Sequence, residues 1–120
     1  MLDRANRNKQ SAHADNVSFI ESLITDVKLP DAIADCIISN CVVNLVPEAE
    51  KQLVFNEMAR LLKPGGRVAI SDILVRKELT AELKESIALY VGCVAGASRV
   101  DAYERYLKEA GFGGKFEYYE

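Results

Sequence analysis

The sequence lacks the features that identify membrane and exported proteins. No part of it approaches the roughly 20 consecutive apolar residues that a membrane-spanning helix needs. Its start, MLDRANR, has neither the hydrophobic stretch nor the cleavage site of a signal peptide. We therefore expect a soluble protein of the cytoplasm, with no membrane partner.

Basic residues and cysteines are also scarce. There are 15 Lys and Arg against 18 Asp and Glu, which gives a formal net charge of −3. Nucleic-acid-binding proteins usually concentrate Lys and Arg on one face, so nucleic acid is not an expected partner. The three cysteines are an odd number in a chain without an export signal. This argues against a disulfide framework and for reduced thiols.

What the chain does contain is typical of one globular domain. Its 120 residues are 49% apolar and 28% charged, without an internal repeat, a low-complexity tract or a linker. We interpret residues 1–120 as a single domain. Strands are predicted at residues 17–20, 35–40 and 68–74. The middle of residues 35–40, DCIISN, is almost continuously apolar, which is typical of a central parallel strand covered on both faces.

Two helices are predicted before residue 68. Residues 1–13 are polar and predict a weak helix. Pro47 opens a second helix, which ends at Pro64-Gly65-Gly66. Its apolar stripe, expected to face the sheet, consists of Val54, Met58, Leu61 and Leu62. The basic residues on this segment and its exit are expected to be solvated: Lys51, Arg60, Lys63 and Arg67.

Two more helices and a last strand are predicted after residue 74. One helix begins near Thr80 as N-cap, and another follows Ser98, with Asp101 at the spacing of a capping box. Gly111 ends the latter, and residues 115–120 indicate another strand. The apolar face of this last helix consists of Tyr103, Tyr106, Leu107 and Ala110. Strands that alternate with helices in this way predict an α/β fold with a mostly parallel sheet and flanking helices.

Three short blocks, in this order, resemble the second half of class I S-adenosylmethionine-dependent methyltransferases. They are residues 35–40 (DCIISN), 61–66 (LLKPGG) and 70–72 (ISD). Within that superfamily, residues 39–45 (SNCVVNL) and 89–97 (LYVGCVAGA) are similar to the arsenite S-adenosylmethionine methyltransferases. The resemblance implies a partial Rossmann-like fold, S-adenosylmethionine as methyl donor, and arsenite or thiol-bound As(III) as the small-molecule substrate.

The resemblance also implies that Cys41 and Cys93 bind As(III) and carry the catalysis. Arsenic(III) is thiophilic and needs sulfur ligands from different loops. In the family its lone pair attacks the donor's methyl carbon directly, so proximity takes the place of a general base. Cys41 falls just past the C-terminal end of a predicted parallel strand, where open α/β sheets place ligands, and Cys93 lies in a glycine-flanked turn.

The residues alone favour a simpler interpretation of these cysteines. Cys41 and Cys93 would then be small buried hydrophobes, as free cysteines commonly are. Cys36 lies within a predicted strand and is expected to be a buried core residue. A zinc site that combines the cysteines with His13 has no supporting ligand spacing.

For the donor, the resemblance places the adenine against Leu23 and Ile24 and the methionine end near Ser39 and Asn40. Leu23 and Ile24 are equally compatible with the core, and Ser39 and Asn40 with a role in the following turn. The sequence has no GxGxG turn between a strand and a helix, and Gly65-Gly66 does not substitute for one. We therefore expect this chain to bind the donor weakly and to be inactive alone.

The resemblance has a further consequence for the sheet. In the family's sheet, the strands at residues 17–20 and 35–40 are the third and fourth, separated by the first two strands, which are missing here. One edge of the fourth strand is then exposed, and exposed edges recruit further strands. We expect a homodimer through this edge, or closure of the gap by residues 17–20.

Two other functions stay open at this point. The chain could derive from another small-molecule methyltransferase, in which Cys41 and Cys93 only pack. It could also be a non-catalytic module that binds arsenite or another soft ion through its thiols.

Overall fold

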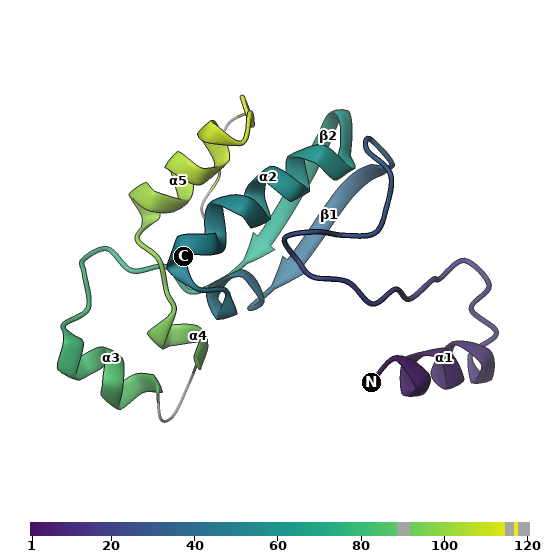
Figure 1. Ribbon diagram of the computed structural model, residues 1–120, viewed down its shortest axis with the longest axis horizontal. Helices are drawn as coiled ribbons and strands as arrows, with labels where there is room; N and C mark the ends of the chain where they lie inside the picture. The colour runs from purple at the N-terminus through teal and green to yellow at the C-terminus, as the bar shows by residue number, and fades with distance from the viewer. Residues whose placement is uncertain (89–91, 115–116, 118–120) are drawn as a thin grey trace.

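The computed structural model describes residues 1–88, 92–114 and 117, without the side chains of residues 87–93. The predicted strand at residues 115–120 therefore lies outside the described residues, except for Glu117. Within them, no helix is long and apolar enough to cross a membrane. Seven elements position the site (Figure 1): β1 (Ala34–Asn40), η1 (Val43–Leu45), η2 (Glu48–Glu50), α2 (Lys51–Leu61), β2 (Leu62–Ser71), α4 (Gly92–Ala95) and α5 (Val100–Glu109).

The two strands run parallel and are joined through α2. Their register is regular from Cys36 opposite Arg67 to Asn40 opposite Ser71. Parallel strands need a crossover connection, and the 3₁₀ turns η1 and η2 together with α2 supply it. This confirms the predicted α/β fold with a parallel sheet and flanking helices, as a two-stranded sheet in the described part of the chain.

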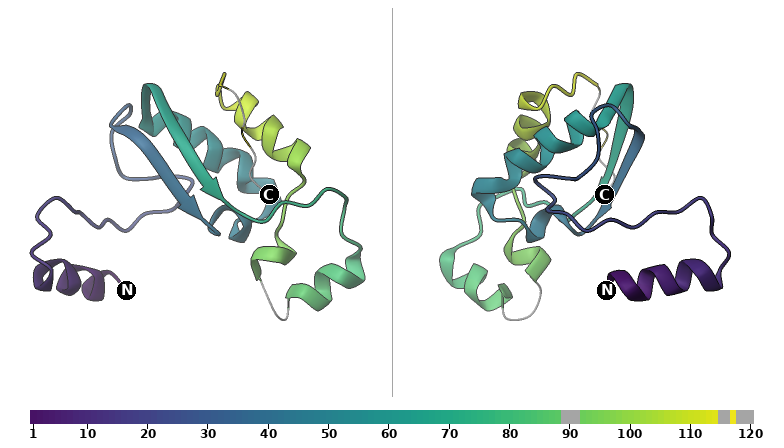
Figure 2. Two further views of the ribbon diagram at one scale, coloured as in Figure 1. Left: turned by 180° about the vertical axis from the view of Figure 1, so that it is seen from behind. Right: turned by 45° about the vertical axis from the view of Figure 1, so that its right-hand side comes forward.

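The core lies between the sheet and two helices, α2 and α5, which cover the same face of it (Figure 2). The ring of Phe55 meets the ring of Tyr103 edge-on, with 5.1 Å between centroids, and stacks on Tyr106 at 5.7 Å. Such aromatic pairs add to the free energy of burial. The predicted inward faces of both helices are largely confirmed, since the buried cluster consists of Val43, Val54, Phe55, Met58, Tyr103, Tyr106 and Leu107.

The other face of the sheet is open to solvent. Side chains alternate along β1, so that Ile37 and Ser39 face the core while Cys36 and Ile38 are exposed, Ile38 by 81%. The prediction that this strand is covered on both faces is wrong, and so is the burial predicted for Cys36. The reason is that the described helices that pack on the sheet, α2 and α5, cover only the face of Ile37.

The Pro64-Gly65-Gly66 turn, predicted to end the preceding helix, lies within β2, because α2 already ends at Leu61 and β2 begins at Leu62. Pairing shifts between Ala34, which is opposite Leu62, and Cys36. Gly65 has a left-handed backbone with φ +81°, and a Cβ on Gly66 would lie 2.9 Å from both Leu62 Cδ2 and the Lys63 carbonyl oxygen. Each position therefore requires glycine for its own reason, one for conformation and the other for space.

The N-terminal region differs from the prediction in one respect. The weak helix is confirmed as α1 (Leu2–Ser11), which is described throughout and buries none of its side chains. Residues 17–20 form no strand, and Phe19 and Ile20 are partly exposed. An isolated strand leaves its backbone groups unpaired, and in the described residues no neighbouring strand is available to this segment. Closure of the open edge by residues 17–20 is therefore not observed.

The later helices begin close to their predicted positions. Thr80 caps α3 (Ala81–Ala88), because its Oγ1 accepts a hydrogen bond from the Leu83 amide at 3.3 Å. The predicted capping box before α5 is wrong, because Arg99 is the N-cap and no side chain caps that end. The Ser98 hydroxyl is instead hydrogen-bonded to Lys51 and Glu48, which removes it from the helix end.

Candidate functional site

The C-terminal ends of β1 and β2 form the centre of the candidate site. Cys41 follows directly after β1 and is half-buried. Its backbone is left-handed, with φ +54°, and its amide donates a hydrogen bond of 2.8 Å to the Ser71 carbonyl at the end of β2. A left-handed backbone is unfavourable for a residue with a Cβ, and such positions cluster at functional sites.

The segment after Cys41 is held by a buried asparagine. Asn44, in η1, is only 2% exposed and donates through Nδ2 to the Ile73 carbonyl at 2.7 Å. Since Ile73 follows β2, this bond joins the segments that leave the two strands. It fixes η1, and with it the exit from Cys41, against the end of the sheet.

Helix α4 brings the second cysteine block to the same place. α4 contains Cys93 and packs against η1, which begins two residues after Cys41. The side chain of Cys93 lies outside the described residues. An open cleft of about 740 Å³ lies here, lined from one side by Asn44, Leu45 and Val46 and from the other by Ala95, Gly96, Ala97 and Ser98.

A larger groove follows β2 to its C-terminal end, where Ser71 and Asp72 line it. It has a volume of about 1490 Å³ and runs beside β2, where Val68, Ile70 and Tyr103 line it. Cys41 does not line this groove, and neither does any other described residue of η1 or α4. Cys41 does not line the smaller cleft either, but Asn44 and Leu45 of η1 and Ala95 of α4 do, so we place the candidate site beside that cleft.

Three polar side-chain atoms at the strand ends are buried without a hydrogen-bond partner among the described residues. They are Ser39 Oγ, Asn44 Oδ1 and Asp72 Oδ1. Buried polar atoms are nearly always paired, so unpaired ones indicate places where a bound molecule or water completes the site. The other oxygen of Asp72, Oδ2, accepts a 2.8 Å hydrogen bond from the Tyr103 hydroxyl. Burial, and then this carboxylate, raise the pKa of Tyr103 far above its ordinary value.

The residues predicted to hold the donor's adenine are in different environments. Leu23 is 70% exposed at a tight turn that pairs it with Asp26, whereas Ile24 packs against the core. The Val27 amide just after this turn donates to Glu57 Oε1 at 2.7 Å. Of the residues predicted for the methionine end, Ser39 faces the core and Asn40 is exposed.

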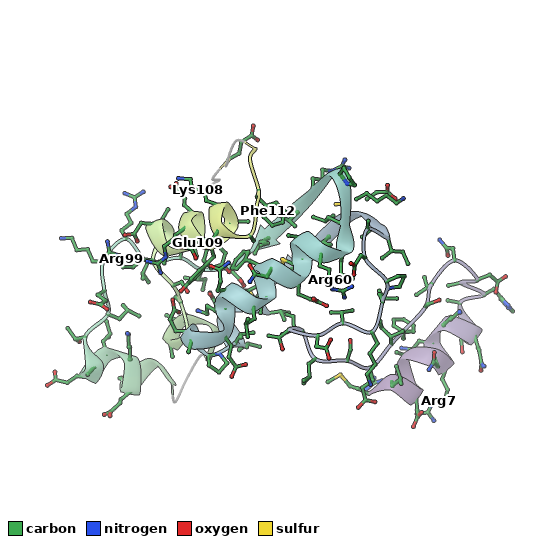
Figure 3. The ribbon with its side chains drawn as sticks, turned by 45° about the horizontal axis from the view of Figure 1, so that its top comes forward. Arg7, Arg60, Arg99, Lys108, Glu109 and Phe112 are labelled. Carbon is green, nitrogen blue, oxygen red and sulfur yellow. The ribbon has the colours of Figure 1, made fainter. Side chains whose placement is uncertain are left out.

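Arg60 tethers the segment that leads into β1 (Figure 3). Its guanidinium donates to the carbonyls of Val27 and Leu29, both at 2.9 Å, and to the Glu57 and Asp31 carboxylates. The hydrogen bond from Arg60, aided by the Val27 amide, holds the pKa of Glu57 below its ordinary value against the opposing effect of burial. These contacts anchor residues 27–31 to the end of α2.

An ionic junction at the start of α2, between the buried Lys51 and the exposed Glu48, was missed by sequence reasoning. Lys51 was predicted to be solvated, but its side chain is fully buried. The Nζ donates to the Gly96 carbonyl at 2.5 Å, to Ser98 Oγ at 2.6 Å and to Glu48 Oε2 at 2.9 Å. The one signal in the sequence is the i, i+3 spacing of Glu48 and Lys51, which is too common on exposed helices to indicate burial.

Glu48 is the acceptor at the centre of this junction. Its Oε2 also accepts from the Ser98 hydroxyl at 2.9 Å, and its Oε1 accepts from the Tyr106 hydroxyl at 2.5 Å. Burial, the largest single influence, raises the pKa of Glu48, but the hydrogen bonds from Tyr106, Lys51 and Ser98 together hold it below its ordinary value. The lowered pKa favours the charged carboxylate of Glu48 in this junction.

Comparison with known proteins gives a consistent result. Residues 1–111 match a protein family described as a methyltransferase domain. The chain is 43% identical over 112 residues to an arsenite methyltransferase of Halobacterium salinarum, and 37% identical over 92 residues to the human arsenite methyltransferase. These alignments cover 93% and 74% of this chain, but only 28% and 24% of the relatives.

A solved structure shows the same fold. The arsenic(III) S-adenosylmethionine methyltransferase from Chlamydomonas reinhardtii superposes with a TM-score of 0.72 at 34% sequence identity. The match covers 81% of this chain and 33% of that structure. The chain therefore spans about a third or less of the length of the proteins it is similar to.

Proposed function

Since the chain belongs to the methyltransferase domain family, we propose that it is the substrate-binding part of an S-adenosylmethionine-dependent arsenite methyltransferase. Cys41 and Cys93 bind As(III) as thiolates in this proposal. The names of the relatives support the reaction, because they are arsenite methyltransferases at 43% and 40% identity. The assignment of the two cysteines rests on the resemblance of residues 39–45 and 89–97 to that family.

The observation that carries the proposal is the packing of α4 on η1. Cys41 and Cys93 are 52 positions apart in the sequence, yet the elements that hold them are in contact at one end of the sheet. A soft ion that prefers sulfur needs thiolates that approach from different segments. The left-handed backbone of Cys41 is compatible with a functional role, because such positions cluster at functional sites, but His13 and Ala32 share it.

The reaction follows from the chemistry of arsenic(III). Its lone pair forms a bond to the donor's methyl carbon, the carbon–sulfur bond breaks, and the electrons of that bond go to the donor's sulfur. Arsenic is formally oxidised from III to V, and the sulfonium becomes a neutral thioether. No proton is transferred in this step, so the residues need only bind and orient the substrate.

Two residues at the end of β1 are assigned to one part of the donor in this proposal. They are Ser39 and Asn40 for the methionine end, although the unpaired Ser39 hydroxyl faces the core and the Asn40 amide lies on the exposed face of β1. Leu23 and Ile24 provide apolar surface for the adenine. When bound, the donor supplies an electrophilic methyl group on a sulfonium. The sequence contains no GxGxG turn for its remaining contacts.

Arsenite binding tests the assignment of the thiolates. All variants are made in a protein that already carries Cys36→Ser, called the parent. This substitution removes the exposed third thiol, so that it does not contribute to binding. Cys41→Ser and Cys93→Ser should each weaken As(III) binding about 100-fold, because a single thiolate loses the effective concentration of a pair. As(III) affinity that survives both substitutions would show that the cysteines only pack.

Donor binding separates an enzyme part from a non-catalytic thiol module. Labelled S-adenosylmethionine should bind weakly to this chain, and Ser39→Ala and Asn40→Ala should weaken it further. The matched control is Asn56→Ala, an exposed position on α2. If the protein binds As(III) but its affinity for S-adenosylmethionine does not change in Ser39→Ala or Asn40→Ala, the non-catalytic thiol module is favoured.

The proposal includes the setting and assembly of the chain. Thiolate ligands must stay reduced, which fits the cytoplasm. Within the described residues β1 pairs with β2 alone, so its other edge is available for a second copy of the chain. Light scattering should show a dimer, and Ile38→Asp, on the exposed face of β1, should shift it towards monomer. A monomer at every concentration would exclude this assembly.

A further inference from the structure

The buried ammonium of Lys51 accounts for the position of the loop that follows Cys93. Lys51 is the first residue of α2 and is fully buried. A buried cation costs several kcal/mol unless it is paired and hydrogen-bonded. Of the three acceptors around its Nζ, Glu48 Oε2 is local, whereas the Gly96 carbonyl and Ser98 Oγ belong to the loop between α4 and α5. Displacement of this loop would leave the ammonium with one acceptor.

The loop is also held from its other side. The Val75 amide donates to the Ser98 carbonyl at 3.0 Å, and the Val100 amide donates to the Val75 carbonyl at 3.3 Å. Ser98 is itself buried, and its hydroxyl connects Lys51 to Glu48. Residues 96–98 are therefore clamped between the start of α2 and the segment after β2.

The clamp extends from the loop to α4. The Ala97 amide donates to the Val94 carbonyl at 3.1 Å, so the loop continues the turn of the helix that contains Cys93. α4 in turn packs on η1, next to Cys41. A shift of the loop would therefore move Cys93 relative to Cys41.

We propose that Lys51 is a positioning residue that holds α4, the helix of Cys93, against the segment that follows Cys41. This rests on the proposed function, in which both thiols bind one arsenic. Lys51 lines the smaller cleft, but in this role it acts through residues 96–98 and not by contact with arsenic. Its ammonium fixes residues 96–98, and these fix α4, so that the backbone segments of the two cysteines are held together before As(III) arrives. Preorganisation of this kind raises affinity because less ordering occurs on binding.

The test compares two cations of the same helix. In a Cys36→Ser parent, Lys51→Met removes the ammonium but keeps the length of the side chain. Arg60→Met is the matched control, because Arg60 also lies on α2 but anchors residues 27–31. Ser98→Ala is a milder variant that removes one contact of Lys51, in case Lys51→Met does not fold. Circular dichroism identifies a temperature at which each variant is folded.

Two readouts are measured on each folded variant. The first is the As(III) dissociation constant, and the second is the rate at which a short bifunctional alkylating reagent bridges Cys41 to Cys93, identified by peptide mapping. Lys51→Met should weaken As(III) binding about tenfold and slow the bridging to a similar extent, since both depend on effective concentration. Ser98→Ala should act in the same direction. Arg60→Met should lower stability and leave both readouts unchanged.

The outcomes separate this inference from the proposed function. One outcome is that As(III) affinity does not depend on Cys41 and Cys93 while the bridging rate still depends on Lys51. This outcome would refute the assignment of the cysteines to arsenic and would support the positioning role of Lys51. A parent in which the two thiols are not bridged would overturn the inference. So would unchanged bridging in Lys51→Met and Ser98→Ala, or equal losses in Lys51→Met and Arg60→Met.

Discussion

The amide of Cys41 donates a 2.8 Å hydrogen bond to the carbonyl of Ser71, which joins the ends of the two parallel strands. This bond forms while Cys41 has a left-handed backbone. The chain thus turns sharply out of β1 at the residue that we assign to arsenic, and the pairing of the sheet continues one residue past the strand. The conformation that places the thiol there is one that disfavours any residue with a Cβ.

Glycine at position 41 should therefore stabilise the fold relative to alanine. Cys41→Gly should exceed Cys41→Ala by about 1 kcal/mol in unfolding free energy, because a left-handed backbone penalises the Cβ of alanine. Urea unfolding measures both. The control is the same alanine-to-glycine change at an exposed strand position without a left-handed backbone, Ala69→Gly in β2, where glycine should reduce stability. Equal stability of the two Cys41 variants would show that the backbone is not strained in solution.

The two adjacent glycines of β2 should respond to alanine through different mechanisms. In Gly66→Ala the new Cβ would lie 2.9 Å from the Lys63 carbonyl oxygen, a backbone atom that cannot rotate away, so we expect a loss of about 1–3 kcal/mol. Gly65→Ala meets no neighbour within 4 Å, and only its left-handed backbone should reduce stability, by about 1 kcal/mol. Gly113→Ala, which has neither restriction, is the control. A tolerated Gly66→Ala would contradict the tight register shift at Ala34.

Local sequence patterns predicted the elements whose cause is local. The apolar spacing of Val54 and Met58 on α2 gave the correct inward face, and Thr80 and Gly111 marked helix ends that the structure confirms. The order of β1, α2 and β2 followed from the alternation of patterns along the chain. These features depend on residues a few positions away in the sequence. The periodicity of apolar residues over such short distances is therefore sufficient to predict them.

The incorrect predictions concern residues whose environment is set by distant segments. Lys51 is buried because Gly96 and Ser98, more than 40 positions away, provide acceptors for it. Cys36 lies in an apolar stretch that is typical of a buried strand, but its side chain is on the open face of β1. Residues 17–20 have strand propensity and no partner strand among the described residues. Propensity describes what a segment can form, whereas burial and pairing depend on what is packed against it.

Removal of the Asn44 side chain should have a much larger effect than removal of an exposed asparagine. Asn44→Ala leaves the Ile73 carbonyl without its 2.7 Å donor in a buried place, which should cost about 1–3 kcal/mol. Asn56→Ala, on the exposed side of α2, should change the unfolding free energy by about 0.5 kcal/mol or less. Urea unfolding of both variants tests this. Similar losses would mean that the link between η1 and the end of β2 contributes nothing in solution.

Acid should destabilise the protein through two carboxylates at opposite ends of α2. Glu48 and Glu57 both have a folded-state pKa below the ordinary value, so the unfolded state takes up more protons as the pH falls. Their contribution is present above the unfolded pKa of about 4.3 and is lost as the pH falls through the folded values. Urea unfolding from about pH 6 to about pH 3 should show this decline. Glu48→Gln and Glu57→Gln should each flatten part of it, and the double variant should flatten both parts, because the two groups have separate partners. Gln variants with the same acid dependence as the parent would contradict the assignment of these carboxylates.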